Sequence, residues 1–153
     1  MRMLKASVIP LALALILGAC STNLSPVERI ALYESHAGPP VNDFRYFGSI
    51  SWTPLGDQAL AVWTKPNEAW LLNLFGPCYD LDVAPAISIS NMMGRVSARF
   101  DKVHVVGGGM GSSMRMPCQI QSIRPLDVKS LKAAEKQLRE AKLVEREAEN
   151  TGS

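Results

Sequence analysis

The alternation of apolar and polar residues predicts a chain that is mostly β-strand, with a helix at each end. Ser25-Pro26-Val27-Glu28 combines a capping box with proline at the first helical position, which predicts a helix over about 26–35. From Phe44 onward the apolar period changes to two, as is typical of strands. The expected strands cover roughly 44–52, 59–63, 69–75, 86–90, 95–100, 103–106 and 118–123.

Some of these strands carry a more detailed expectation. Residues 69–75 are apolar on both faces, so we expect this strand to be central in its sheet. The last strand changes phase between Ile120 and Ile123, which indicates a bulge or an edge. The alternation in 95–100 turns three side chains toward the core: Val96, Ala98 and Phe100.

The elements together predict a mainly β (α+β) domain at 26–126. We expect a small antiparallel sheet, rolled or barrel-like, with a short N-terminal helix and a charged C-terminal helix at 127–149. Residues 150–153 are expected to form a disordered end.

The C-terminal helix has a thin apolar stripe among six acidic and six basic residues. Asp127 can cap it, and Glu135–Arg139 and Lys136–Glu140 are suitable i,i+4 pairs. Such a helix suits pairing with a helix of another envelope protein. A solvated tail without a partner is the alternative.

Residues 1–19 have the layout of a secretory signal: a positive start at Arg2 and Lys5, a short apolar run and small residues. The apolar run is too short to span about 30 Å of hydrocarbon as a helix. Leu17-Gly18-Ala19-Cys20 resembles the bacterial lipobox. That resemblance implies diacylglycerol on the Cys20 thiol, cleavage before it and a further acyl chain such as palmitate, with 20–25 as a lipidated tether. An ordinary signal peptide with a chance cysteine is the alternative.

The residue after Cys20 bears on localisation. It is Ser21 rather than aspartate. By analogy with the sorting rule of lipoproteins in Gram-negative cells, serine favours the outer membrane, where the chain would face the periplasm.

Composition places the chain among globular proteins of one domain. Its 153 residues are 47% apolar and 20% charged, which excludes a charged disordered chain. Without Arg2 and Lys5 the 16 basic residues become 14, equal to the 14 acidic residues. Positive charge is not clustered, so a nucleic-acid partner is not expected.

Two further cysteines, Cys78 and Cys118, form an even pair once Cys20 is acylated. Export to an oxidising compartment predicts a disulfide between them. Two buried free thiols are the alternative. Neither cysteine has a C-x-x-C partner, so we expect no metal and no cofactor.

Residues that could support catalysis are few. Asp80 and Asp82 place two carboxylates on one side of an extended segment, a pattern that suits acid–base chemistry and also occurs in ordinary loops. Asp101 and His104 are three residues apart, on opposite faces of a strand unless a bulge intervenes. His36 lies beside a helix end, where a positive side chain suits the dipole.

Two other segments have features of possible binding sites. The glycine-rich stretch 107–113 lacks the residues of a phosphate or dinucleotide loop. We interpret it as a hairpin loop, with an anion-binding nest as the alternative. Trp52, Trp63 and Trp70 are concentrated in a short segment; Trp63 and Trp70 could pair across a hairpin. Core packing and a platform of exposed indoles both remain open for them.

The chain resembles a family of uncharacterised exported proteins of Gram-negative bacteria, domain of unknown function 6491, over roughly 27–128. Phe44-Arg45-Tyr46-Phe47-Gly48, Trp52-Thr53-Pro54-Leu55-Gly56-Asp57 and Gly76-Pro77-Cys78 carry the resemblance, together with the segment from Cys118 to Asp127. The resemblance implies a small exported domain with paired cysteines; the family has no established activity, so it transfers no catalytic residue. Because the sequence lacks familiar catalytic motifs, we expect a non-enzymatic binding or assembly module; the alternative is a small envelope hydrolase using Asp80/Asp82 or Asp101/His104.

Overall fold

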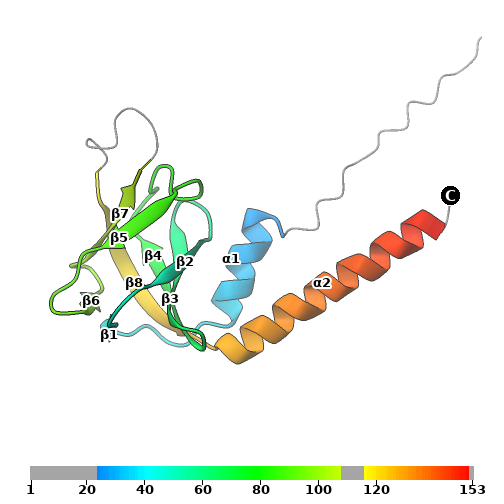
Figure 1. Cartoon of the computed structure of the whole chain (residues 1–153), viewed down its shortest axis with the longest axis horizontal. Helices are drawn as coiled ribbons and strands as arrows, with labels where there is room; N and C mark the ends of the chain where they lie inside the picture. The colour runs from blue at the N-terminus through cyan, green and yellow to red at the C-terminus, as the bar shows by residue number, and fades with distance from the viewer. Residues whose placement is uncertain (1–23, 108–115, 152–153) are drawn as a thin grey trace, which may run out of the picture.

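The protein is a mainly β structure with one helix at each end, described by a computed structural model over residues 24–107 and 116–151 (Figure 1). The helices are α1 (Pro26–Ser35) and α2 (Val128–Thr151). The strands are β1 (Asp43–Arg45), β2 (Ser51–Pro54), β3 (Ala59–Lys65), β4 (Glu68–Leu74), β5 (Ala86–Ile89), β6 (Arg95–Ser97), β7 (Lys102–Val106) and β8 (Cys118–Leu126).

Six strands form one antiparallel sheet in the order β2-β3-β4-β8-β7-β5, and β1 pairs with β6 in a separate two-stranded ribbon. The predicted mainly β fold is confirmed, and β4 is central as expected. The sheet is not closed into a barrel, because β2 and β5 are its two edges and do not pair with each other.

The capping box predicted for the first helix is formed. The Ser25 hydroxyl accepts the Glu28 N–H at 3.2 Å, and the Glu28 carboxylate accepts the Ser25 N–H at 2.8 Å. The hydrogen bond from the Ser25 backbone holds the pKa of Glu28 below its usual range. These bonds fix where α1 begins and therefore where its side chains lie relative to the sheet.

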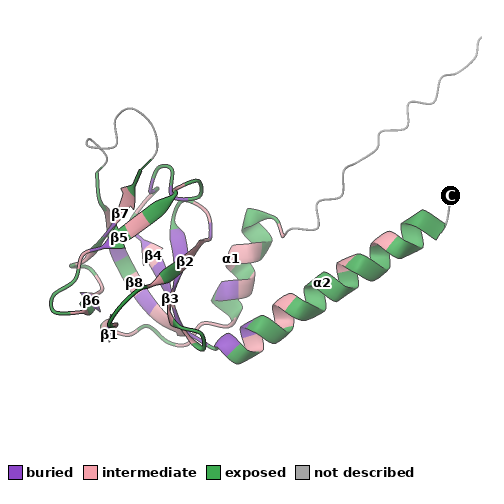
Figure 2. Cartoon of the chain, in the orientation of Figure 1, coloured by how far each residue is buried: buried purple, intermediate pink, exposed green. Residues whose placement is uncertain are grey.

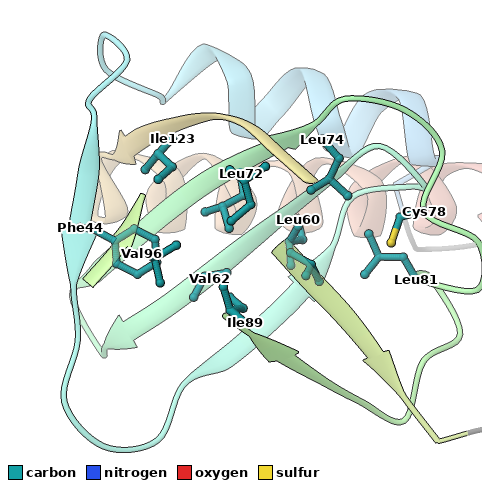
Figure 3. Packing of buried hydrophobic residues seen from close by; sticks show 12 residues of the cluster. Phe44, Leu60, Val62, Leu72, Leu74, Cys78, Leu81, Ile89, Val96 and Ile123 are labelled. Carbon is teal, nitrogen blue, oxygen red and sulfur yellow. The ribbon is translucent and has the colours of Figure 1, made fainter. Parts of the chain in front are cut away.

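Side chains of β3 and β4 alternate between two apolar clusters on opposite faces of the sheet. Leu60, Val62 and Leu72 enter the larger cluster, which we call the main core (Figure 3). Ala61 and Leu71 enter the smaller one, which we call the helix-side core because α1 and α2 cover it. The helix-side core consists of Tyr33, Leu55, Ala59, Ala61, Ala69, Leu71, Leu126, Val128 and Leu131.

The strand predicted at 44–52 is two strands in different sheets, so that prediction is wrong in its extent. Gly48 lies between β1 and β2 with φ +101°, a backbone conformation that glycine adopts without strain. The Tyr46 N–H donates to the Gly94 carbonyl at 2.9 Å, which continues the pairing of β1 with β6 rather than with β3.

The predicted strand at 95–100 ends early, at Ser97. Arg99 has φ +67°, which breaks the strand alternation. Val96 is buried as predicted, but Phe100 is 82% exposed rather than directed into the core. The expected interruption near Asp101 is present, and β7 follows it.

The last strand contains the predicted irregularity. Asn73 pairs with Ser122 and Leu74 with Ile120, so one residue of β8 is skipped. This bulge brings both Ile120 and Ile123 into the main core despite their odd spacing.

Helix α2 begins at a formed cap, as predicted. The Asp127 carboxylate accepts the Ser130 N–H at 3.1 Å, which lowers the pKa of Asp127. Val128 and Leu131 are buried, but most of the other residues of the helix are exposed (Figure 2). The helix extends to Thr151, two residues past the expected end.

Candidate functional site

The paired cysteines form the predicted disulfide. The Cys78 and Cys118 sulfurs are bonded, and their Cα atoms are 5.6 Å apart, within the range for disulfides. The bond joins the loop after β4 to the start of β8 and closes a separation of 40 residues. Cys78 is itself fully buried in the main core, so the bond is part of the packed structure.

Asp101, one of the candidate catalytic residues, has a structural role. One carboxylate oxygen accepts the Ser90 hydroxyl and the other accepts the Ser97 N–H, both at 2.7 Å. The Ser90 hydroxyl oxygen in turn accepts the Lys102 N–H at 2.9 Å. These bonds tie the ends of β5 and β6 to the start of β7, which accounts for an acidic residue at this position.

The other candidate catalytic residues do not gather around Asp101. His104 lies within β7 opposite Ser88 of β5. Asp80 and Asp82 lie in the exposed turn that follows Cys78. Four cavities are described below for the part of the chain that the structure describes. None of the four candidate side chains, Asp80, Asp82, Asp101 and His104, lines any of these cavities.

His36 lies at the C-terminal end of α1, as predicted. Its Nδ1 is 2.8 Å from the Leu32 carbonyl oxygen, and its own carbonyl accepts the Asp127 N–H at 2.9 Å. His36 therefore joins the end of α1 to the start of α2. This contact is structural.

The three tryptophans do not form one platform. Trp70 lies opposite Val62 and packs against the main core, where its ring stacks on Phe44 with 5.1 Å between centroids. Trp63 lies opposite Ala69 on the other face of the sheet, and its indole N–H donates to the Thr53 hydroxyl at 3.2 Å. The suggested pairing of Trp63 with Trp70 is therefore wrong: their positions differ by an odd number of residues across the hairpin, which places them on opposite faces.

A cleft of about 220 Å³ lies where α1 approaches α2. The Tyr33 hydroxyl crosses it and donates to a Glu135 carboxylate oxygen at 3.1 Å. Burial raises the pKa of Tyr33 to about 12, and the negative charge of Glu135 adds to this effect. The cleft is lined by Leu24, Arg29, Tyr33, Thr53, Glu135, Leu138, Arg139 and Lys142.

The remaining cavities lie on the β domain. An apolar groove of about 540 Å³ runs beside the disulfide and exposes Phe75, Tyr79 and Met116. A second hollow of about 500 Å³ lies between β1, β6 and β8. A shallower one of about 360 Å³ lies beside the turn that joins β3 to β4.

The sequence pattern does not indicate that Arg29 or Tyr33 belongs to a site, and it indicates Arg139 only as an i,i+4 partner of Glu135. Each was assigned to a helix, but no local pattern indicates which faces of two helices 100 residues apart will meet. The spacing of Glu135 and Arg139 predicts an i,i+4 pair, but the Glu135 carboxylate accepts the Tyr33 hydroxyl instead. The other predicted pair, Lys136–Glu140, is present at 3.8 Å.

Several predicted features fall outside the described residues. They are the signal at 1–19, the lipobox Cys20 and residues 108–113 of the glycine-rich stretch. Among the described residues, His, Cys, Asp and Glu side chains form no group of three or more that could hold a metal ion. No helix in that part of the chain is both long and apolar enough to cross a membrane.

Comparison with known proteins identifies the family. A model described as a family of unknown function, DUF6491, matches residues 3–142. The chain belongs to this family. Searches of curated proteins and of solved structures find no match. Membership of DUF6491 confirms the resemblance noted in the sequence, and the matched range includes both Cys20 and the two disulfide cysteines.

Proposed function

We propose that this DUF6491 protein is an envelope lipoprotein, attached to the periplasmic face of the outer membrane by a lipid on Cys20, and that it acts as a non-enzymatic binding or assembly module. The observation that carries the proposal is the Cys78–Cys118 disulfide, because such bonds persist in oxidising compartments outside the cytoplasm. The signal-like residues 1–19 supply a route to that compartment.

Lipidation of Cys20 follows from its position. The two other cysteines are joined to each other, which leaves Cys20 as the thiol for a different chemistry. It directly follows the apolar run and small residues of the lipobox pattern. Several acyl chains on one residue would hold the protein firmly, whereas one chain holds a protein only reversibly.

A non-enzymatic role is supported by the use that the fold makes of its candidate catalytic groups. Both carboxylate oxygens of Asp101 accept hydrogen bonds from nearby serines. Asp80, Asp82 and His104 lie apart from the described cavities. A hydrolase would need such groups within hydrogen-bond reach of one substrate.

The distal half of α2 supplies the surface for a partner protein in this proposal. Leu143 and Val144 are 52% and 66% exposed on a helix of alternating charge. A narrow apolar seam between charged residues suits pairing with a helix of another envelope protein.

Metabolic labelling with radioactive palmitate tests the anchor. We expect the wild-type protein to incorporate label and Cys20→Ser to incorporate none and to leave the membrane fraction. Cys78→Ala/Cys118→Ala is the matched control, because it removes cysteines without touching the lipobox, and it should remain labelled. Label retained by Cys20→Ser would overturn the lipoprotein assignment.

Density-gradient separation of inner and outer membranes tests the location. The wild-type protein should be recovered with the outer membrane, and Ser21→Asp should move it to the inner membrane. Ser21→Thr is the conservative control and should behave as wild type. An unchanged distribution for Ser21→Asp would contradict the proposed sorting by this residue.

A further inference from the structure

The cleft between α1 and α2 carries an excess of positive charge. Arg29 comes from α1 and Arg139 and Lys142 come from α2, whereas Glu135 is the one acidic side chain among the residues that line it. One oxygen of Glu135 accepts the Tyr33 hydroxyl. The cleft therefore favours an anionic ligand.

Two of these cations are available to such a ligand. Within the described part of the chain, the guanidinium groups of Arg29 and Arg139 form no hydrogen bond and no ion pair. Guanidinium groups bind phosphate oxygens through paired N–H donors. Two of them facing one cleft suit a phosphodiester better than a single carboxylate.

The position of the cleft along the chain indicates where the anion comes from. Leu24 lines the cleft and is four residues from Cys20. An extended chain spans at most about 3.6 Å per residue, so Cys20 lies within about 14 Å of Leu24. The polar layer on each side of a bilayer is roughly 5–7 Å deep. If Cys20 is acylated, as the proposed function requires, the cleft lies at or beside the layer of lipid phosphates.

We propose that this cleft binds the phosphate of an anionic phospholipid, in the membrane to which Cys20 is attached. Arg29 and Arg139 contact the phosphate, and Leu24 and Leu138 face the apolar part of the lipid next to it. The inference rests on the proposed lipoprotein function and adds to it a second membrane contact. Two contacts fix the orientation of the protein, whereas a lipid on a tether alone does not.

The two contacts also determine which part of the protein faces away from the membrane. Both helices lie on one side of the sheet (Figure 1). With the cleft at the lipid surface, the sheet and the apolar groove beside the disulfide are directed toward the periplasm. The distal part of α2 stays close to the membrane.

The test uses the lipidated full-length protein in nanodiscs of phosphatidylcholine with increasing phosphatidylglycerol. Amide hydrogen exchange is followed in residues 24–33 and 135–142. We expect exchange in both segments to slow as phosphatidylglycerol is added. Paired N–H donors of the two guanidinium groups hold the phosphate in this proposal, so Arg29→Gln/Arg139→Gln should lose the slowing of exchange in both segments.

Lys129→Gln/Lys136→Gln is the matched control, because it removes the same charge from α2 outside the cleft. It should respond as the wild type does. An equal loss in the control and the cleft variant would mean general attraction to an anionic surface and would overturn the site. Protection by inorganic phosphate in phosphatidylcholine nanodiscs, at millimolar concentration, would show a site for free phosphate and would overturn the assignment to lipid.

Intact mass measured on the same protein distinguishes failure of the proposed lipoprotein function from failure of the phospholipid site. A mass without acyl chains overturns the proposed function and, with it, the location of the cleft at the bilayer. Acylated protein whose exchange does not respond to phosphatidylglycerol overturns the phospholipid site and leaves the lipoprotein function intact.

Discussion

The β domain and helix α2 are held in the fold in different ways. The main core brings together buried side chains from seven strands and from the loop after β4, and the disulfide joins that loop to β8. Helix α2 has 24 residues, of which Val128 and Leu131 are buried. The β domain is therefore held together by burial of side chains that are far apart in the sequence, whereas α2 is held by a short segment at its start.

The docked segment of α2 is fixed by more than its apolar residues. The Lys132 ammonium donates to the Pro66 carbonyl at 2.8 Å and lies 5.8 Å from the Trp63 ring centroid. Glu135 accepts the Tyr33 hydroxyl. Beyond these contacts most side chains of the helix are exposed, and many of them are charged.

The largest effect is expected from removing the disulfide, which belongs to the β domain alone. Cys78→Ala/Cys118→Ala should lower the free energy of unfolding by about 4 kcal/mol, because a closed loop of 40 residues limits the entropy of the unfolded chain. Urea unfolding of the oxidised wild type and the variant measures the difference. Equal midpoints would mean that the bond adds nothing to a core that is already fixed by burial.

A pair of leucine substitutions compares the docked and distal parts of α2 directly. Leu131→Ala removes a fully buried side chain and should lower the free energy of unfolding by about 3 kcal/mol. Leu138→Ala changes the same residue type seven positions on, where the side chain is partly exposed, and should cost less than about 1 kcal/mol. Similar losses for the two variants would erase the proposed boundary within the helix.

The sequence predicted the helices and the central strand because their signals are local. The capping residues Ser25 and Asp127 and the two-sided apolar character of β4 each describe their own segment. The Cys78–Cys118 disulfide was also predictable, because two cysteines remain once Cys20 is set aside. The glycine at 48, which divides one expected strand between two sheets, could not be read from alternation alone.

The cleft could not be predicted because its signal is not local. Its side chains come mainly from α1 and α2, and the sheet that lies between these helices in the sequence brings them together. Tyr33 looks like an ordinary apolar position of a short helix until Glu135 is placed beside it. The structural role of Asp101 was equally hidden, because its hydrogen-bond donors Ser90 and Ser97 come from other segments.

The Tyr33–Glu135 contact predicts a smaller effect with a characteristic pH dependence. Tyr33→Phe should cost about 1 kcal/mol at neutral pH, the usual net contribution of one hydrogen bond. The native pKa of about 12 is above the unfolded value of about 10, so the native state holds this proton more tightly. The contribution is therefore complete below pH 10 and is lost as pH rises from 10 to 12.

Urea unfolding at pH 8, 10 and 11 measures this dependence. The wild type should lose more stability than Tyr33→Phe above pH 10, since both share every other titrating group. Tyr46→Phe is a suitable control, because its hydroxyl accepts an exposed Asn91 amide instead. Parallel curves for the wild type and Tyr33→Phe would show that the Tyr33 proton is not held by the fold.

The smallest effect is expected from shortening α2 beyond its docked segment. The sequence pattern, read alone, predicts that even truncation after Val128 leaves stability almost unchanged, because the apolar stripe is thin. The burial of Leu131 changes that expectation: this truncation removes a side chain of the helix-side core and should cost several kcal/mol. Truncation after Lys142 keeps Leu131, Glu135 and the whole cleft. The melting temperature should therefore stay within about 3 °C of the full chain, a smaller change than a loss of about 1 kcal/mol would cause.

In-cell crosslinking of the protein truncated after Lys142 then tests the distal helix alone. Loss of a crosslinked partner from a folded protein places the partner on the removed residues 143–153, and retention of every crosslink places it on the part of the protein that remains.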